Sequence, residues 1–206
     1  MPQSNRIILT DVDGVLLEWE NHFTQWMLKR SHFVRRKRRQ TYKLLPNKQS
    51  EYAMEKRFGV TPTVIQREIR EFNRSAWMAT QPPLPEAVTY VKLLHAEGWT
   101  FIPITSQTSD VPAQMLRKRL LSELFGEHVF QNYFILETGD DKHSALSEFT
   151  KTGLHYVEDK WQNCMTALKY GLKPILINHA YNQQFKHPKV KRVNNWRDIH
   201  QYLSKR

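Results

Sequence analysis

The sequence predicts an α/β fold built on a parallel sheet, and two patterns support this prediction. Short apolar runs rich in strand-forming residues recur along the chain, and helix-length stretches of mixed polarity lie between the later runs. Strands that alternate with helices in this way are typical of right-handed βαβ units, in which helices cover both faces of a parallel sheet. The apolar runs occupy residues 6–10, 100–105, 133–136, 154–157 and 174–178.

The interval from residue 17 to about residue 85 interrupts this alternation. Three helices are expected there, over residues 21–42, 50–58 and 61–78, and the pair Thr61-Pro62 is typical of an N-cap followed by the first helical position. The cluster Pro82-Pro83-Leu84-Pro85 should return the chain to the main domain. We therefore expect a core formed by residues 1–16 and 86–206, with a helical insertion over residues 17–85.

Positive charge is concentrated in one short segment. The chain has 31 Lys and Arg against 20 Asp and Glu, a net charge of +11. Residues 29–43 contain eight of the basic residues and no acidic one, so the rest of the chain carries only 11 − 8 = +3. A polyanion would bind mainly through this segment.

Composition also limits the setting in which the protein works. No apolar run approaches the roughly 20 residues of a membrane-spanning helix, and the first residues lack the apolar stretch of a secretory signal. A single cysteine, Cys164, excludes an internal disulfide and a multi-cysteine zinc site. We therefore expect a cytoplasmic protein that does not span a membrane.

Two carboxylates directly follow the first apolar run, in Asp11-Val12-Asp13-Gly14-Val15. Open α/β sheets bind ligands at the carboxyl ends of their strands, and a glycine permits a tight turn there. One carboxylate in such a turn could attack an electrophile while the other moves a proton. A plain polar turn is the alternative, because Asp and Gly are common in turns.

The same segment resembles the first signature of the haloacid dehalogenase (HAD) superfamily, and three further elements follow in that superfamily's order. Thr105-Ser106 ends an apolar run, Lys142 stands at the start of a helical stretch, and Glu158-Asp159 ends a later apolar run. The resemblance extends from residue 6 to about residue 178. It implies a HAD-like Rossmannoid parallel sheet of about five strands with an inserted α-helical cap.

The resemblance also implies roles for these residues. In that superfamily the first aspartate is the nucleophile, so Asp11 would form an aspartyl-phosphate. Asp13 would protonate the leaving oxygen and then activate water. Thr105 would donate its hydroxyl group to the phosphate, beside the backbone amide of Ser106.

A Mg²⁺ ion is the implied cofactor, held by Asp11, the backbone carbonyl of Asp13 and an acid of the last pair. We assign direct metal ligation to Asp159. The longer Glu158 would orient Lys142 or a metal-bound water. Lys142 itself opposes the dipole of the helix that it starts, which favours a functional role over that of a solvated surface lysine.

The insertion should choose the substrate. Trp19 lies just beyond the acidic turn, and the stretch is similar to the start of 5′(3′)-deoxyribonucleotidases, in which an aromatic residue at this offset stacks on the nucleobase. Phe23 and Trp77 would complete the slot. Most aromatic residues of the insertion are nevertheless expected to be core.

The basic run offers a different interpretation. Its arginines could contact the phosphates of a DNA or RNA strand, as single-strand-binding surfaces do. A solvated helix face is the alternative. The arginines concerned are Arg35, Arg36, Arg38 and Arg39.

Together these observations predict a Mg²⁺-dependent phosphomonoesterase that hydrolyses (deoxy)nucleotide 5′-monophosphates. A phosphatase acting on 3′- or 5′-phosphate ends of DNA or RNA is one alternative, and a non-catalytic nucleic-acid-binding protein on the same fold is another. The expected partner is a phosphorylated small molecule, with a nucleic acid at residues 29–43 as the alternative partner.

Overall fold

A parallel sheet forms the centre of the protein. The computed structural model describes residues 6–34, 38–48 and 51–204. The strands of the sheet are β1 (Ile7–Thr10), β4 (Thr100–Ser106), β5 (Phe134–Leu136), β6 (His155–Glu158), β7 (Lys173–Ile177) and β8 (Lys191–Val193). They lie in the order β5-β4-β1-β6-β7-β8, and every neighbouring pair is parallel. The predicted α/β fold with a parallel sheet is thus confirmed.

The sheet has six strands where about five were expected. The additional strand is β8, whose sequence Lys-Arg-Val lacks an apolar run. It pairs on one side only, with β7, and so lies at the edge of the sheet. An edge strand needs fewer apolar side chains than a buried one, which is why the apolar pattern did not reveal it.

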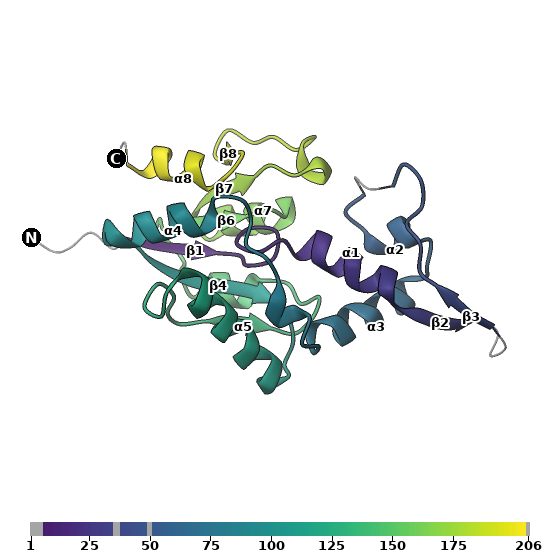
Figure 1. Ribbon diagram of the computed structural model, residues 1–206. Helices are drawn as coiled ribbons and strands as arrows, with labels where there is room; N and C mark the ends of the chain where they lie inside the picture. Colours follow the sequence, from purple (N-terminus) through teal and green to yellow (C-terminus); the bar gives the residue numbers. More distant parts are fainter. Residues whose placement is uncertain (1–5, 35–37, 49–50, 205–206) are drawn as a thin grey trace, which may run out of the picture.

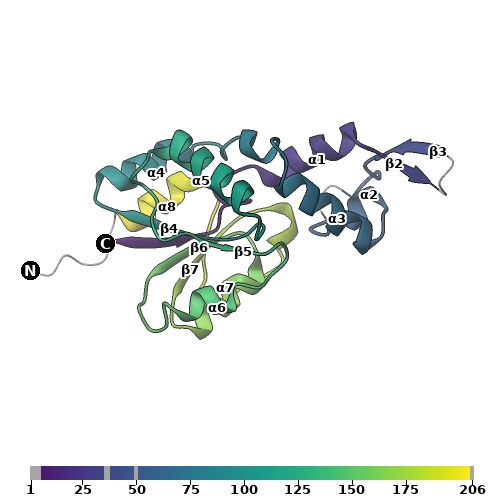
Figure 2. The ribbon, with the colours of Figure 1, turned by 90° about the horizontal axis from the view of Figure 1, so that it is seen from below.

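Helices cover both faces of the sheet (Figure 2). On one face lie α4 (Ala87–Ala96), α5 (Val111–Phe125) and α8 (Trp196–Leu203). On the other lie α6 (His143–Ser147) and α7 (Trp161–Lys169). A short 3-10 helix, η2 (Ala180–Asn182), follows β7. Among the residues that the structure describes, none of the helices has the length and apolar character that a membrane span requires.

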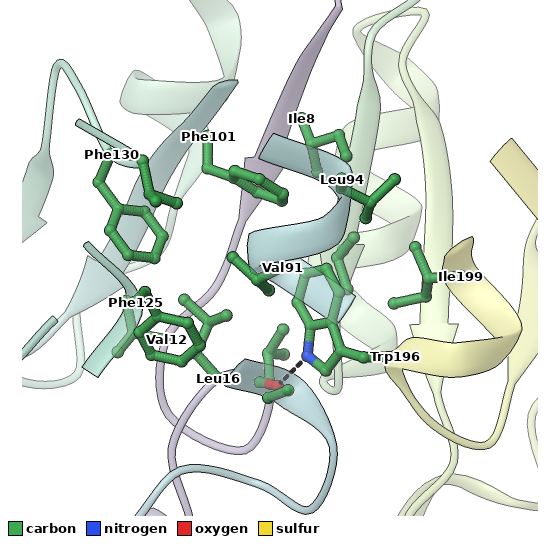
Figure 3. Close-up of a cluster of buried hydrophobic side chains, with 14 of the residues drawn as sticks. Ile8, Val12, Leu16, Val91, Leu94, Phe101, Phe125, Phe130, Trp196 and Ile199 are labelled. Carbon is green, nitrogen blue, oxygen red and sulfur yellow. Dashed lines mark hydrogen bonds between the residues drawn. The ribbon is translucent and has the colours of Figure 1, made fainter. Parts of the chain in front are cut away.

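The larger core cluster fixes the turn after β1. Figure 3 shows Ile8 of β1 and Phe101 of β4 packed with Trp196 of α8. The indole Nε1 of Trp196 donates a hydrogen bond to the backbone oxygen of Val15, at 2.7 Å. Because Trp196 is buried, this bond ties the chain just beyond the acidic turn to the core.

The insertion between β1 and α4 extends from one end of the sheet (Figure 1). Its elements are α1 (Trp19–Lys29), β2 (Ser31–Val34), β3 (Arg38–Thr41), α2 (Met54–Phe58), α3 (Pro62–Asn73) and the 3-10 helix η1 (Met78–Thr80). It has its own apolar cluster around Phe23, Trp26 and Phe72. That cluster also contains Ala113 of α5, so the insertion packs against the core.

The expected helix over residues 21–42 is wrong in its second half. Helix α1 ends at Lys29, and the chain continues as an antiparallel hairpin in which Ser31 pairs with Thr41 and Val34 with Arg38. Like charges three and four residues apart destabilise a helix, and the run 35–39 consists of such charges. A helix continued beyond Lys29 would therefore carry this repulsion.

The other two expected helices are present but shorter. Helix α2 begins at Met54 and not near residue 50, and α3 ends at Asn73, before η1. The predicted start of α3 is confirmed, because the Thr61 hydroxyl oxygen accepts a hydrogen bond from the backbone N–H of Val64, at 3.4 Å.

Candidate active site

The candidate site lies where three neighbouring strands end. Asp11 directly follows β1, Thr105 lies near the end of β4, and Glu158 is the last residue of β6. Strands β4, β1 and β6 are parallel neighbours, so their carboxyl ends meet at one edge of the sheet. Motifs far apart in the sequence are brought together there.

Three buried carboxylates form a cluster at this edge. One oxygen of each of Asp11, Glu158 and Asp159 lies within 4.8 Å of the others. Lys142, directly before α6, places its Nζ 2.7 Å from Asp11 Oδ2 and 3.0 Å from Glu158 Oε2. Burial would lower the pKa of this lysine, but the two carboxylates raise it above its usual value, so Lys142 remains charged.

The Glu158 carboxylate is saturated with hydrogen bonds. Its Oε1 accepts from the backbone N–H groups of Asp159 and Lys160, both at 3.0 Å. Its Oε2 accepts from three side chains, those of Lys142, Tyr156 and Asn163. Burial opposes ionisation, yet Lys142 and these bonds hold the pKa of Glu158 well below its usual range. With its lone pairs occupied, Glu158 is placed to orient Lys142.

Asp11 and Asp159 are in a different electrostatic situation. Burial, followed by repulsion from Glu158, raises the pKa of both carboxyl groups. Asp11 Oδ1 accepts the backbone N–H of Val12, at 2.7 Å, and Asp159 Oδ2 accepts the hydroxyl of Tyr181. Three buried acids thus lie close together with one lysine, and a bound cation would offset the repulsion between their ionised forms. Oxygen donors of this kind suit Mg²⁺, so the residues present fit the implied ion.

Thr105 holds an unused hydrogen-bonding group in the site. Its Oγ1 is buried and has no hydrogen-bond partner within the part of the chain that the structure describes. A buried polar atom without a partner costs free energy, so this hydroxyl is available for a ligand. The neighbouring Ser106 donates its hydroxyl to the backbone oxygen of Asp140, at 2.8 Å.

Asp13 lies in the same turn, but its carboxylate is engaged by an arginine. Arg117 of α5 is fully buried and contacts both carboxylate oxygens, with Nη1 to Oδ1 at 2.6 Å and Nη2 to Oδ2 at 3.2 Å. Gln81 contacts Oδ1 at 3.4 Å. Proton transfer by Asp13 therefore requires this ion pair to open.

Gly14 brings the acidic turn against the last acid. Its φ angle is +78°, a conformation that favours glycine, and an added Cβ would lie 2.5 Å from Asp159 Oδ2. The backbone oxygen of Gly14 also contacts His179 Nε2, at 2.8 Å. No side chain fits at position 14 without displacing Asp159.

A cavity of about 590 Å³ opens above these residues. Asp11, Thr105, Lys142 and Asp159 line it from the core. From the insertion it is lined by Trp19, Glu20, Tyr52, Ala53, Met54, Glu55, Gln66, Ile69, Arg70 and Asn73. Core and insertion therefore both contribute walls to one cavity.

The three aromatic residues expected to form a stacking slot do not converge. Trp19 lines the cavity. Phe23 is fully buried and stacks on Trp19, with ring centroids 4.8 Å apart, so it supports that ring from within the insertion core. Trp77 is not part of the cavity wall and packs beside His22, with Lys29 Nζ 4.6 Å from its ring centroid.

Within the basic segment, the basic side chains that the structure describes are those of Lys29, Arg30 and Lys43, and none of them lines this cavity. Arg35 and Arg36 lie outside the described residues, and Arg38 and Arg39 belong to β3, where only the backbone is described. The hairpin of β2 and β3 lies at the end of the molecule farthest from the two termini (Figures 1 and 2).

Several residues of the site were not predicted from the sequence. Arg117 and Tyr181 reach Asp13 and Asp159 from 104 and 22 residues away. No spacing rule links such pairs. Gln66, Arg70 and Asn73 do share a helical spacing, which could have marked one face of α3, but the sequence does not show that this face meets the acidic turn.

Solved hydrolases share this fold. A predicted phosphatase from Clostridium acetobutylicum has a TM-score of 0.65 and 14% identity, over 97% of this chain and 98% of that one. A HAD-like family hydrolase from Streptococcus pneumoniae has a TM-score of 0.64 and 13% identity, over 96% and 97%. The D,D-heptose 1,7-bisphosphate phosphatase from B. bronchiseptica, solved with magnesium and phosphate, has a TM-score of 0.54 and 12% identity, over 97% and 98%.

The chain has a HAD-like fold. At these identities the likeness establishes the fold alone. No family model matches the sequence, and no curated protein matches it either.

Proposed function

We propose that the protein is a phosphomonoesterase that uses Asp11 as its nucleophile. The observation that carries this proposal is the meeting of Asp11, Lys142, Thr105 and Asp159 at one cavity. The Asp11 carboxylate lies 2.7 Å from the Lys142 ammonium group. Thr105 offers a hydroxyl without a partner among the described residues, and Asp159 offers a second acid. Phosphoryl transfer needs such positioning and charge stabilisation more than it needs elaborate covalent chemistry.

The reaction would proceed in two steps. The Asp11 carboxylate attacks phosphorus, the bond between phosphorus and the leaving oxygen breaks, and the leaving oxygen takes a proton from Asp13. For this step the ion pair between Arg117 and Asp13 opens and Asp13 takes up a proton from solvent beforehand. A water molecule then gives a proton back to Asp13 and cleaves the aspartyl-phosphate, which releases inorganic phosphate and restores Asp11. Lys142 offsets the charge that gathers at Asp11, and Thr105 donates to a phosphoryl oxygen.

We further propose Mg²⁺ as the cofactor, held by the carboxylates of Asp11 and Asp159 and the backbone carbonyl of Asp13. When bound, it supplies the positive charge that reduces repulsion between the carboxylates and the phosphoryl group. The heptose bisphosphate phosphatase of similar fold was solved with magnesium and phosphate. The raised pKa values of Asp11 and Asp159 also favour a resident cation.

Residues 17–85 would act as a cap that covers the site and selects the substrate, with the core formed by residues 1–16 and 86–206. A (deoxy)nucleotide is the proposed substrate class, since Trp19 presents an aromatic ring at the cavity wall and Phe23 supports it. A phosphatase for DNA or RNA ends is the second candidate, favoured by the eight basic residues between positions 29 and 43.

A panel of phosphate esters tests these proposals. Phosphate release should be measured with deoxynucleoside and nucleoside 5′-monophosphates, sugar phosphates, and oligonucleotides phosphorylated at the 3′ or 5′ end, each with Mg²⁺ and with EDTA. We expect Mg²⁺-dependent release, fastest from the mononucleotides. Faster release from the oligonucleotides would favour the second candidate. No release from any compound would exclude the phosphatase.

A further inference from the structure

The cavity wall formed by α3 carries polar groups that the proposed chemistry does not use. Four residues of this helix line the cavity: Gln66, Ile69, Arg70 and Asn73. The last three follow the first by three, four and seven residues, so all four lie on one face of the helix. The core residues that would handle the transferred phosphate line the same cavity. The α3 face is therefore placed to contact the remainder of the substrate.

Arg70 differs from neighbouring arginines of the insertion because it has no carboxylate partner. Arg30 and Arg67 each lie 2.8 Å from Glu68. Arg70 is exposed, lines the cavity, and forms no hydrogen bond or ion pair with the residues described. Its guanidinium keeps all its donors, in a geometry that matches a carboxylate or a phosphate.

The other charged groups of the insertion wall do not neutralise Arg70. Glu20 is bonded by Arg57, at 2.6 Å. Glu55 lines the cavity, but neither Arg70 nor any other basic group within the described ranges lies within ion-pair distance of it. Among the described residues of this wall, Arg70 is thus a cation and Glu55 an anion that form no ion pair. A second negative charge on a substrate would be attracted to Arg70 and repelled by Glu55.

Asn73 adds an acceptor to the same face. Its side chain is 2% exposed, and its Nδ2 donates to the backbone oxygen of Gln107, at 2.7 Å. Its Oδ1 is buried and has no partner among the residues that the structure describes. A buried acceptor of this kind calls for a donor such as a hydroxyl group.

We propose that Arg70 and Asn73 form a subsite for a second anionic group and a neighbouring hydroxyl. The substrate is then a hydroxylated phosphate ester that carries two anionic groups, such as a nucleoside bisphosphate or a sugar bisphosphate. One phosphate lies at Asp11 and the other anion at Arg70. This inference rests on the proposed function and narrows its substrate class.

Paired ligands that differ by one phosphate test the subsite. Calorimetric titration of the non-reacting Asp11→Asn variant with Mg²⁺ would use adenosine 5′-monophosphate against adenosine 3′,5′-bisphosphate, and ribose 5-phosphate against ribose 1,5-bisphosphate. We expect the bisphosphate of at least one pair to bind about tenfold more tightly. Arg70→Gln in the same background should abolish this preference. Arg74→Gln is the matched control, because Arg74 is exposed near the end of the same helix and does not line the cavity.

The deciding quantity is the ratio of the dissociation constant of the monophosphate to that of the matching bisphosphate. The subsite is overturned if both members of each pair bind equally well or if no ligand binds. It is also overturned if the preference for the bisphosphate survives Arg70→Gln. The same titrations on the wild-type chain in EDTA provide a second background, should Asp11→Asn fail to fold. Glu55→Gln should strengthen the preference, because it removes a repulsive charge.

Turnover of the wild-type chain separates this inference from the proposed function. Phosphate release together with a preference that persists in Arg70→Gln refutes the subsite alone. A preference that depends on Arg70, without phosphate release from any compound, refutes the phosphatase and leaves the subsite standing.

Discussion

The two walls of the cavity are held in different ways. On the core side, Asp11 directly follows β1, Glu158 ends the adjacent parallel strand β6, and Lys142 bonds both of them. On the insertion wall, most lining residues belong to α1, α2 and α3, which pack around a separate aromatic cluster. The connection to the core includes the bond from Asn73 to the backbone oxygen of Gln107, beyond β4.

This contrast suggests that the two walls have different roles, one in chemistry and the other in substrate selection. Paired neighbouring strands hold the core groups in a fixed geometry, which chemistry requires. The insertion can change its lining residues without disturbing the sheet, which suits substrate selection. Substitutions on the core wall should therefore affect turnover or metal binding, and those on the insertion wall should affect the choice of ligand.

The largest effect is expected at the nucleophile. Asp11→Asn keeps the size of the side chain and an acceptor oxygen but removes nucleophilicity, so kcat should fall about a thousandfold or more. Asp198→Asn is the control, because Asp198 lies in α8, away from the cavity. Phosphate release and the melting temperature should be measured together. Retained turnover in a folded Asp11→Asn chain would refute the assignment of Asp11 as the nucleophile.

A smaller effect is expected at Tyr181, whose hydroxyl bonds Asp159 Oδ2. Tyr181→Phe removes the donor that orients a proposed metal ligand, and such changes typically weaken metal binding by about 10- to 100-fold. Mn²⁺ affinity, measured by electron paramagnetic resonance, gives a readout independent of turnover. Tyr170→Phe is the matched control, because Tyr170 contacts His143 and does not line the cavity. Equal Mn²⁺ affinity in the two variants would contradict the proposal that Tyr181 orients a metal ligand.

The insertion wall should respond differently. Trp19→Ala should reduce kcat/KM for nucleotides about tenfold, since stacking of a base on an aromatic ring contributes about 1–3 kcal/mol. The loss for ribose 5-phosphate should be smaller. Trp77→Ala is the control, because Trp77 belongs to the insertion but not to the cavity wall. An equal loss for nucleotides and ribose 5-phosphate would argue against stacking.

The smallest expected effect is a pH dependence of metal stabilisation. Burial and Glu158 raise the pKa of Asp11 and Asp159 in the metal-free protein. The folded chain then holds protons that the unfolded chain releases. The contribution of these two groups to the free energy of unfolding is therefore greatest below the ordinary aspartate pKa of 3.8 and falls as pH rises through the folded values. Mg²⁺ competes with these protons.

The rise in Tm caused by Mg²⁺ should therefore be a few degrees larger at about pH 7.5 than at about pH 5. Calorimetric scans in EDTA and in excess Mg²⁺ at both pH values measure this difference. A gain in Tm that does not depend on pH would mean that the ion binds elsewhere.

The sequence predicted the parts of the molecule that depend on local pattern. Apolar runs located five of the six strands of the sheet, and Asp11, Thr105 and Glu158 stand at strand ends, as their positions after those runs suggested. Parallel pairing then brings these ends together without further information.

What the sequence did not reveal depends on tertiary contact. The bond between Arg117 and Asp13 joins residues that no period relates. The hairpin pairs β2 with β3, whose sequences Ser-His-Phe-Val and Arg-Arg-Gln-Thr contain no long apolar run. Phe23 and Trp77 were expected to complete a slot beside Trp19. Only the packing of the insertion distinguishes the ring at the cavity wall from those away from it.

The tight contact at Gly14 has a practical consequence for redesign. A single methyl group there would press on an oxygen of Asp159, so the floor of the cavity tolerates no enlargement next to that acid. A mutational library intended to shift the ligand range should leave positions 11–14 untouched and randomise residues 66, 69 and 70. Diversity at those helix positions would sample new ligands while the reacting groups keep their spacing.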